Sequence, residues 1–323
     1  MKYRFCGNSG LQLPLVSLGL WHNFGDVDDF SLATDMILRA FEQGITHFDL
    51  ANNYGPSPGS AETNFGKILH SHLKAHRDEM VVSSKAGYPM WSGPYGDGGS
   101  RKYLMASIDQ SLKRTGLDYF DIFYTHRYDA QTPLEETIQA LIDIVKQGKA
   151  LYIGLSRYPA DKARQAYEMM DAQHVRCLIF QDKYNLLYRA PEAELMPLNA
   201  TMGKGFIVFS PLAQGVLTNR YLNGIPENSR VAKSHGFLKK TDITPEVLAK
   251  VQKLNELAQK RGQTLAEMSL AWLLNKKEVT SVIVGASSVK QLQDNIDTIQ
   301  NIDFAAEELQ RIDLLLRGPD SNR

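Results

Sequence analysis

The sequence predicts an α/β protein whose strands close into a (β/α)8 barrel of the TIM type, and two observations support this. Eight short apolar runs alternate with segments whose apolar residues recur about every 3.6 positions, the pattern of strands connected by amphipathic helices. The chain has 323 residues, which suits one large barrel. A doubly wound sheet of about six or seven strands is the rival architecture. The number of apolar runs favours the closed barrel.

The barrel elements can be assigned in chain order. Each expected strand is short, apolar and bounded by polar or turn residues. The eight expected strands are Leu15–Leu20, His47–Ala51, Met80–Ala86, Tyr119–His126, Ala150–Ser156, Cys177–Lys183, Gly205–Pro211 and Val279–Ala286. Helical spacing is clearest in Leu32–Gln43, Lys102–Arg114, Leu134–Gln147 and Asp161–Met170. Strands that alternate with helices pair in parallel, so all strand ends should lie on one face.

Some segments fall outside this repeat. Tyr3–Cys6 and Leu11–Leu13 flank a Gly-Asn-Ser-Gly turn and predict a β-hairpin before the first barrel strand. Tyr88–Ser100 is a loop rich in Gly and Pro, and Thr218–Ile243 is a long basic loop. Loops of that length are usually functional or mobile. We therefore expect an N-terminal hairpin and extended loops at the C-terminal face of the barrel.

Two further helices are predicted near the end of the chain, at Pro245–Arg261 and Thr264–Asn275, with Gly262 between them. We find neither a change in composition that would mark a domain boundary nor a low-complexity segment. Residues 1–323 are therefore expected to form a single barrel domain.

The composition is that of a soluble globular protein, with 43% hydrophobic and 22% charged residues. Basic and acidic residues number 36 each, which argues against a nucleic-acid-binding surface over the whole protein. Cys6 and Cys177 form no disulfide framework, Met1–Gly10 lacks the apolar core of a signal peptide, and no apolar run would span a bilayer. We expect a cytoplasmic protein without membrane insertion, and leave open whether it forms a homo-oligomer.

Polar side chains recur where the predicted strands end. In chain order they are Asp49, Lys85, His126, Ser156, Gln181 and Ser210. Barrel enzymes place their reactive groups at this point, and a polar group there costs free energy unless it pairs with another group or a ligand. Any one of these residues could be a satisfied structural residue. Their recurrence at the same point of successive repeats predicts a functional site.

Tyr54, just beyond the second strand, makes an acid–base set with Asp49, Lys85 and His126. A free tyrosine has a pKa near ~10 and is a poor proton donor at neutral pH. A nearby lysine cation stabilises tyrosinate and lowers that barrier. Asp49 would keep Lys85 charged and oriented, while His126 could hydrogen-bond a substrate carbonyl. This set predicts proton delivery to an oxygen that gains negative charge.

Over nearly its whole length the sequence resembles the aldo-keto reductases. The matching motifs are His47–Gly55 with Gly59-Ser60-Ala61-Glu62, Ser84-Lys85, Tyr124-Thr125-His126-Arg127, Ser210-Pro211-Leu212 and Gly285–Asn295. Trp21–Gly25, Gly93–Gly96 and Gly99–Leu104 are most similar to the branch with bacterial L-glyceraldehyde 3-phosphate reductase and the potassium-channel β-subunits. The resemblance implies that Asp49, Tyr54, Lys85 and His126 are a catalytic tetrad, with Tyr54 as proton donor.

The resemblance also implies a nicotinamide cofactor, NADPH or its oxidised form NADP+. Ser156 and Gln181 would hold the nicotinamide carboxamide, and Trp21 would line the mouth of the site. The full cofactor-binding set is Trp21, Asp49, Ser156, Gln181, Phe209, Ser210, Pro211, Leu212, Gly215, Arg220, Arg230, Gly285, Ser287, Gln291, Asp294 and Asn295. The start of the last barrel helix, with its free backbone N–H groups, suits a phosphate.

Two residues depart from the family's pattern. Phe209 stands where relatives often have a hydroxylated aromatic residue or Trp against the nicotinamide, and its π-face should serve equally well. Ser288 stands where relatives commonly carry an arginine that could pair with the 2′-phosphate. The resemblance makes NADPH the expected cofactor, and the missing arginine leaves NADH as the alternative.

Other motifs were weighed and set aside. No Gly-x-Gly-x-x-Gly follows a strand, which leaves a Rossmann fold unsupported, and Tyr158 replaces the final glycine of a nucleophile elbow at Gly154–Tyr158. His70, His72 and His76 lie on one expected helix, and His72 and His76 have i, i+4 spacing. Without an acidic ligand beside them, they indicate a solvated helix face, and no metal site is expected.

The resemblance and the acid–base set together predict NADPH-dependent reduction of small aldehydes to alcohols, with hydride from the nicotinamide and a proton from Tyr54. L-glyceraldehyde 3-phosphate and methylglyoxal are the first expected substrates, bound by Trp21, Tyr54, Trp91 and His126. Tyr88 and Tyr95 either shape the same pocket or pack within their loop. The alternative function is an NADP(H)-binding, redox-sensing subunit similar to the potassium-channel β-subunits.

Overall fold

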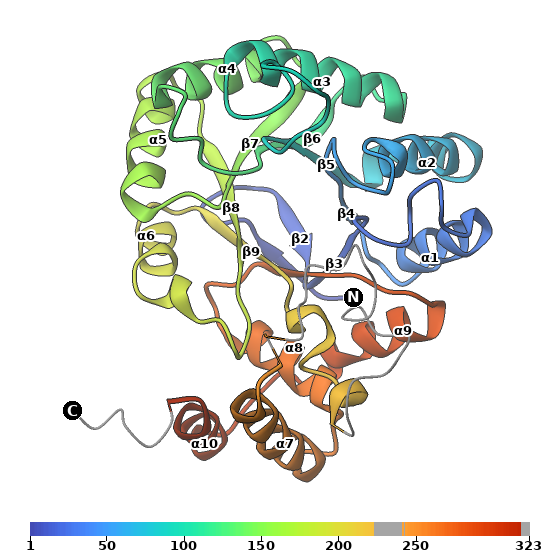
Figure 1. Cartoon of the computed structure of the whole chain (residues 1–323), viewed down its shortest axis with the longest axis vertical. Coiled ribbons are helices and arrows are strands. Elements are labelled where there is room, and N and C mark those ends of the chain that lie inside the picture. The colour runs from blue at the N-terminus through green and yellow to red at the C-terminus, as the bar shows by residue number, and fades with distance from the viewer. Residues whose placement is uncertain (223–240, 242, 318–323) are drawn as a thin grey trace.

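The computed structural model describes residues 1–222, 241 and 243–317. Within them, parallel strands close into a barrel in the order β10-β3-β4-β5-β6-β7-β8-β9 (Figure 1). The strands are β3 (Val16–Gly19), β4 (His47–Asp49), β5 (Val81–Ala86), β6 (Phe120–Thr125), β7 (Ala150–Ser156), β8 (Cys177–Lys183), β9 (Gly205–Phe209) and β10 (Ser281–Val284). The predicted (β/α)8 barrel is confirmed, and the doubly wound alternative is wrong.

Helices form the outer layer around this ring of strands (Figure 1). They are α1 (Phe30–Glu42), α2 (Ser60–Ile68), α3 (Arg101–Thr115), α4 (Leu134–Lys146), α5 (Ala160–Ala172), α6 (Leu195–Thr201), α7 (Pro245–Lys260), α8 (Leu265–Asn275), α9 (Val289–Asp297) and α10 (Ala306–Arg317). Several begin at residues that satisfy free N–H groups, such as Asp29 before α1 and Thr264, whose capping box with Glu267 starts α8. The strands and helices predicted from sequence end within two residues of these bounds.

The predicted hairpin consists of β1 (Tyr3–Phe5) and β2 (Gln12–Pro14), paired antiparallel. Cys6 and Leu13 are fully buried and join the apolar cluster inside the barrel. A Cβ on Gly205, the first residue of β9, would lie 3.2 Å from the Cα of Cys6, so the hairpin covers the end where the strands begin. The opposite end, where the strands finish, is left for the site.

The barrel interior is apolar on one side and polar on the other. Buried Ile122, Ile179, Ile207 and Ile283 belong to the interior cluster together with Tyr124. Gly154 of β7 makes room for that tyrosine, because a Cβ there would stand 2.2 Å from a ring carbon. The polar side contains the buried side chains of Ser17, His47, Ser83 and Ser281.

The three histidines expected on one helix face do not share a regular α-helix, and that prediction is wrong. After α2 the chain continues as a π-helical turn at Leu69–Leu73 and a 3-10 helix at Lys74–Glu79. The change of helix type between His72 and His76 breaks the regular four-residue spacing. No helix in the described ranges is both long and apolar enough to cross a membrane.

Candidate active site

A buried ion pair lies at the ends of β4 and β5. Lys85 Nζ stands 2.6 Å from Asp49 Oδ2 and donates a second hydrogen bond to the Leu50 carbonyl at 2.7 Å. The side chains of Lys85 and Asp49 are 0% and 3% exposed. Charges so completely removed from water need accurately placed partners. The strand ends supply them because Asp49 and Ser83 are register partners in the β4–β5 pair.

Two more donors hold the Asp49 carboxylate. Ser83 Oγ donates to Oδ1 at 2.7 Å, and Gln181 Nε2 donates to the same oxygen at 3.2 Å. Sequence reasoning placed Gln181 at the site but missed Ser83. The signal was available, because side chains two residues apart on a strand point to the same face, and Ser83 precedes Lys85 by two.

Tyr54 and His126 complete the group that the sequence predicted. The Tyr54 ring centroid lies 5.0 Å from Lys85 Nζ and 5.8 Å from the His126 ring centroid. Trp21 stands beside them, with its ring centroid 6.0 Å from that of Tyr54. Tyr54 and His126 keep partial exposure while Asp49 and Lys85 are buried. The arrangement therefore has a buried ion pair inside the barrel and two partly exposed polar rings at the barrel mouth.

The electrostatics of the group differ from the sequence-based expectation at one residue. Burial raises the pKa of Tyr54 well above its usual value, and the nearby Asp49 and Tyr88 raise it further. The lowering expected from Lys85 is outweighed chiefly by burial, and the Asp49 carboxylate beside that ammonium adds to the rise. Tyr54 therefore keeps its proton firmly in the resting protein, and release must await a strong acceptor.

Lys85 and His126 are also shifted. Burial lowers the pKa of Lys85, while the charge and hydrogen bond of Asp49 and the charge of Glu62 raise it. Burial lowers the pKa of His126 well below its usual value, and the Lys85 and Arg127 cations lower it further. The imidazole is therefore neutral at physiological pH, and it can act as a hydrogen-bond donor through one nitrogen.

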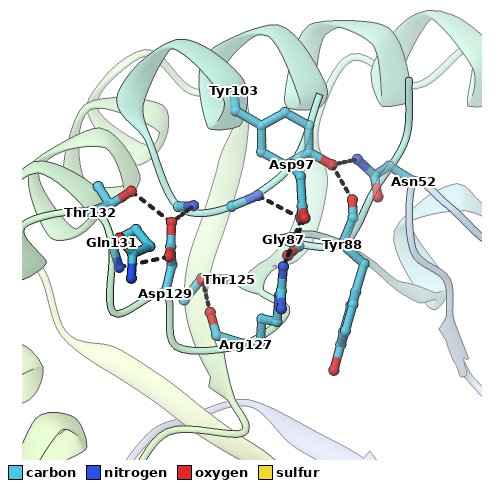
Figure 2. Close-up of polar contacts among 12 residues, drawn as sticks. Asn52, Gly87, Tyr88, Asp97, Tyr103, Thr125, Arg127, Asp129, Gln131 and Thr132 are labelled. Carbon is cyan, nitrogen blue, oxygen red and sulfur yellow. Dashed lines mark hydrogen bonds and ion pairs between the residues drawn. The ribbon is translucent and has the colours of Figure 1, made fainter. Parts of the chain in front are cut away.

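The loop of residues 87–100 is fastened to the end of β6 by Arg127. Arg127 Nε donates to the Gly87 carbonyl at 2.7 Å, and Nη2 donates to both carboxylate oxygens of Asp97 at 2.8 and 2.9 Å. Figure 2 shows Arg127 and Asp97 facing each other, with Tyr88 beside Arg127. Asp129 holds the far end of the loop, because its Oδ2 accepts from the Gly99 amide at 2.8 Å. The loop is thus a fixed wall.

Tyr88 is the loop residue that this clamp brings to the site. Its ring meets the His126 ring edge-on, with centroids 4.7 Å apart, and the Arg127 guanidinium lies 4.8 Å from its centre. Its carbonyl accepts a 2.7 Å hydrogen bond from Tyr103, and its side chain points away from that residue (Figure 2). The sequence left Tyr88 open between pocket and loop packing, and the structure places it against His126.

Trp91 and Tyr95 lie elsewhere in the loop. Trp91 packs against Tyr103 of α3 with ring centroids 5.2 Å apart, so its recorded ring contact is with a helix and not with Tyr54 or His126. Tyr95 is 56% exposed and stands beside the Lys102 ammonium. Of the loop aromatics considered from sequence, Tyr88 is the one in contact with the acid–base group.

The expected carboxamide-binding pair lies next to that group. Ser156 and Gln181 are register partners at the ends of β7 and β8, and both are buried. Ser156 Oγ has no hydrogen-bond partner among the described residues. A buried hydroxyl without a partner is costly, so this one suits a polar ligand group. Phe209, which ends β9, keeps partial exposure and is paired with Lys183 of β8.

The segment after β9 has an unusual backbone. Ser210, Ala213 and Gln214 adopt positive φ angles of 51°, 47° and 57°, and Asn185 holds the Ser210 carbonyl at 2.9 Å. Successive left-handed residues turn backbone N–H groups to one side, a common way of binding anions. Pro211, Leu212 and Gly215 belong to the same segment. Arg220 is exposed just after it, and Arg230 lies outside the described residues.

The expected adenosine-binding residues surround the start of α9. Gln291 Oε1 accepts from both the amide and the hydroxyl of Ser287, while Ser288 caps the helix by accepting from the Gln291 amide. Asp294, exposed on the helix, pairs with Lys290 at 3.0 Å. Asn295 is buried, and its Nδ2 has no partner within the described ranges. Gly285 precedes them, exposed, after β10.

The described residues contain no group of three or more His, Cys, Asp or Glu side chains that could hold a metal ion.

Comparison with known proteins agrees with this geometry. A family model described as the aldo/keto reductase family matches residues 15–317. The chain is 52% identical over 319 residues to an L-glyceraldehyde 3-phosphate reductase of Escherichia coli O157:H7, covering 97% of this chain and 92% of the relative. It is 35% identical over 308 residues to a probable voltage-gated potassium channel subunit beta of Arabidopsis thaliana, covering 94% and 92%.

The barrel, the acid–base group at its mouth and the reductases among its relatives make this protein an oxidoreductase. The chain belongs to the aldo/keto reductase family, whose members use nicotinamide cofactors. The family resemblance noted in the sequence is confirmed, as is its branch, which includes L-glyceraldehyde 3-phosphate reductases and channel β-subunits.

Proposed function

We propose that this protein reduces small aldehydes to alcohols, with NADPH as cofactor and Tyr54 as proton donor. The observation that supports this best is the placement of Tyr54 between the buried Lys85–Asp49 pair and the neutral His126. When bound, NADPH supplies a hydride to the carbonyl carbon. The task of the chain's own residues is to hold the carbonyl and to protonate its oxygen.

Tyr54 keeps its proton until the substrate oxygen becomes basic. Burial disfavours tyrosinate, so transfer from the resting phenol is unfavourable. Once the carbonyl oxygen gains negative charge, it becomes the stronger base. The Lys85 ammonium, 5.0 Å from the Tyr54 ring, then stabilises the phenolate that forms. Asp49 keeps Lys85 charged for this purpose, because it opposes the effect of burial on the lysine pKa.

His126 orients the carbonyl. Its ring is neutral, partly exposed and enclosed between Tyr54 and Tyr88, so a nitrogen that carries hydrogen can donate to the substrate oxygen. A neutral donor polarises the carbonyl without competing with Tyr54 for the proton transfer. Trp21 and Tyr88 bound the space on either side, which favours short, polar aldehydes.

The residues present fit a nicotinamide cofactor. Ser156 Oγ and Asn295 Nδ2 are buried polar atoms that await partners, one beside the acid–base group and one at the adenosine end. Ser156 and Gln181 would hold the carboxamide, and the left-handed segment from Ser210 would hold the pyrophosphate. We propose NADPH from the family resemblance. Ser288 supplies no cation for a 2′-phosphate, so NADH is the alternative to be tested.

The substrate proposal rests on the 52% identical relative, named L-glyceraldehyde 3-phosphate reductase. We propose that compound and methylglyoxal as the first substrates to test. Both are short, polar aldehydes. Trp91, which packs against Tyr103, remains a proposed substrate-binding residue.

The test is the initial rate of NADPH and of NADH oxidation with both enantiomers of glyceraldehyde 3-phosphate and with methylglyoxal. We expect fast NADPH oxidation with the L-enantiomer or methylglyoxal. Tyr54→Phe should lower the rate about 10²- to 10⁴-fold while it leaves the unfolding transition intact. A Tyr54→Phe protein with normal turnover would refute the proton-donor role.

The relatives named as channel β-subunits support a second candidate, an NADP(H)-binding, redox-sensing subunit. Its signature would be tight NADPH binding with negligible turnover on every aldehyde. The same rate measurements, combined with a cofactor-binding titration, separate the two candidates.

A further inference from the structure

A chain of hydrogen bonds runs through the barrel interior from β10 to Asp49. Ser281 Oγ lies 2.7 Å from Ser17 Oγ, which lies 2.9 Å from His47 Nδ1. His47 Nε2 lies 3.0 Å from Ser83 Oγ, and that hydroxyl donates to Asp49 Oδ1 at 2.7 Å. The four residues before Asp49 are 0% exposed. The chain crosses from β10 to β3, β4 and β5 and ends at the acid–base group.

The direction of every bond in this chain follows from its last member. The Asp49 carboxylate, paired with Lys85, only accepts, so the Ser83 hydroxyl hydrogen points to it. The Ser83 oxygen must then accept from His47, which requires the tautomer with hydrogen on Nε2. Burial lowers the pKa of His47 to about 4, so its Nδ1 carries no hydrogen and accepts from Ser17. Since the Ser17 hydrogen points to His47, Ser17 Oγ accepts from Ser281 Oγ, whose hydroxyl also lies 3.3 Å from the Leu15 carbonyl as a second acceptor.

The composition of the barrel interior suggests that this hydrogen-bonded chain has a role other than packing. Ile122, Ile179, Ile207 and Ile283 occupy other interior positions. Buried hydroxyl and imidazole groups cost free energy that apolar side chains would avoid, unless every hydrogen bond is made. The serine and imidazole groups of this chain lie on β10, β3, β4 and β5, and each one is hydrogen-bonded to the next on the way to the Asp49 carboxylate.

We propose that Ser83 and His47 are positioning residues that orient the Asp49 carboxylate and, through it, the Lys85 ammonium beneath Tyr54. This inference rests on the proposed function, because it assigns a purpose to the orientation of Lys85. Ser83 fixes one carboxylate oxygen so that the other faces Lys85. His47 fixes the Ser83 hydroxyl, since its Nε2 hydrogen leaves that oxygen one remaining donation, to Asp49.

The experiment compares matched variants of the whole chain. Ser83→Ala removes the donor to Asp49, whereas Ser84→Ala makes the same change one residue along, where the hydroxyl bonds Glu62 at 2.5 Å. His47→Leu removes the donor to Ser83, whereas His47→Gln retains an amide N–H near the position of Nε2. Urea unfolding of each variant separates loss of folding from loss of orientation.

We expect Ser83→Ala to lower kcat about 10- to 100-fold, as loss of a hydrogen bond to a charged group would, with the KM for aldehyde and the Kd for NADPH little changed. His47→Leu should lower kcat by a smaller factor, and His47→Gln should recover most of it. Ser84→Ala should change kcat less than about twofold. Equal losses in Ser83→Ala and Ser84→Ala, or no recovery in His47→Gln, would overturn the proposal.

The pH dependence of kcat distinguishes a positioning role from a purely structural one, because loss of a structural role alone would not shift it. Asp49 raises the pKa of Lys85, so a misaligned Asp49 should shift the basic limb of the kcat profile to lower pH. The other titratable groups near Lys85 are retained in Ser83→Ala; they are Glu62, Tyr54, Tyr124, His126 and His47. An unshifted limb in a folded, slowed Ser83→Ala variant would count against positioning.

A measurement without turnover keeps this inference separate from the proposed function. In ¹⁵N-histidine-labelled protein, the His47 signals, identified by their loss in His47→Gln, should show a neutral ring with hydrogen on Nε2. The opposite tautomer or a protonated ring at pH 7 would break the chain and the inference with it. Wild-type protein that reduces no aldehyde, yet shows this tautomer, would instead defeat the proposed function.

Discussion

Lys85 and Asp49 form an ion pair with 2.6 Å between Nζ and Oδ2, and neither side chain is more than 3% exposed. Removing both charges from water is costly, and their attraction offsets the cost only while both are present. The pair is therefore a coupled unit, in which each residue's contribution to stability depends on the other.

We predict that Lys85→Met lowers the free energy of unfolding by about 3–5 kcal/mol, because it leaves a buried carboxylate without its counter-ion. The double variant Lys85→Met with Asp49→Asn should lose less than the two single losses combined, by about 0.5–3 kcal/mol. Urea unfolding of the wild type, both singles and the double measures this coupling. Strict additivity would show that the two residues act independently.

The sequence predicted the fold well because barrel strands and helices have distinct periods. β5 and β6 are fully buried six-residue runs, and the amphipathic helices α1 and α4 were located within two residues. The failure came at His70–His76. There the spacing suggested one helix, but the chain changes helix type twice after α2 ends. Periodicity alone does not register such a change.

The site was predictable where the chemistry is carried by strand ends and motifs. Asp49, Tyr54, Lys85 and His126 were named from sequence, and the structure brings them together. Ser83 was missed because a serine within an apolar strand gives no sign of a functional role until its hydrogen-bond partner, Asp49, is known. Tyr88 could not be chosen over neighbouring loop aromatics, because its placement depends on the clamp formed by Arg127 across the fold.

The stability of the protein should fall as the pH drops below about 6.5, and His47 should account for part of that fall. Its pKa is lowered from 6.5 to about 4, so the unfolded chain binds a proton that the folded chain refuses. Stability is complete above the unfolded pKa and decreases as the pH falls through that window, by about 3 kcal/mol at most.

The comparison with His47→Gln isolates this contribution. Burial raises the pKa values of Asp121 and Asp182, which changes stability with pH in the opposite sense in both proteins. Urea unfolding at pH 7.5, 6 and 5 should show a shallower decline for His47→Gln than for the wild type. Identical slopes would mean that His47 titrates alike in the folded and unfolded states.

The hairpin should stabilise the barrel mainly through Arg4. Its guanidinium donates to the carbonyls of Leu274, Lys276 and Val279 at 2.6, 3.1 and 2.7 Å, and so satisfies the end of α8. Arg4→Ala should cost about 2–3 kcal/mol of unfolding free energy, and Arg4→Lys should recover only part, because a lysine lacks the planar fork.

Kinetics provide the control for this prediction. Arg4 lies at the end of the barrel where the strands begin, so kcat and KM should be unchanged in Arg4→Ala at temperatures where it is folded. Lys2→Ala, an exposed neighbour in the chain, should alter stability by less than about 0.5 kcal/mol. Equal stability of Arg4→Ala and Lys2→Ala would show that the Arg4 hydrogen bonds to these carbonyls do not stabilise the protein.

Tyr88 should determine the size of aldehyde that the site accepts. Its ring stands edge-on to His126 at 4.7 Å and is held there by Arg127, so it forms a rigid boundary next to the proposed carbonyl position. Tyr88→Ala should open this side. The kcat/KM for benzaldehyde relative to methylglyoxal should then rise at least about tenfold, within the range that pocket contacts give.

The matched control is Tyr95→Ala, which removes an aromatic ring of the same type from the same loop. Tyr95 is 56% exposed and contacts Lys102, so its removal should leave the substrate ratio at the wild-type value. Arg127→Met, which releases the ring but keeps it in the chain, should broaden specificity less than Tyr88→Ala does. If Tyr95→Ala changes the ratio as much as Tyr88→Ala, the boundary is set by the loop as a whole. If only Tyr88→Ala does so, the ring that faces His126 sets it.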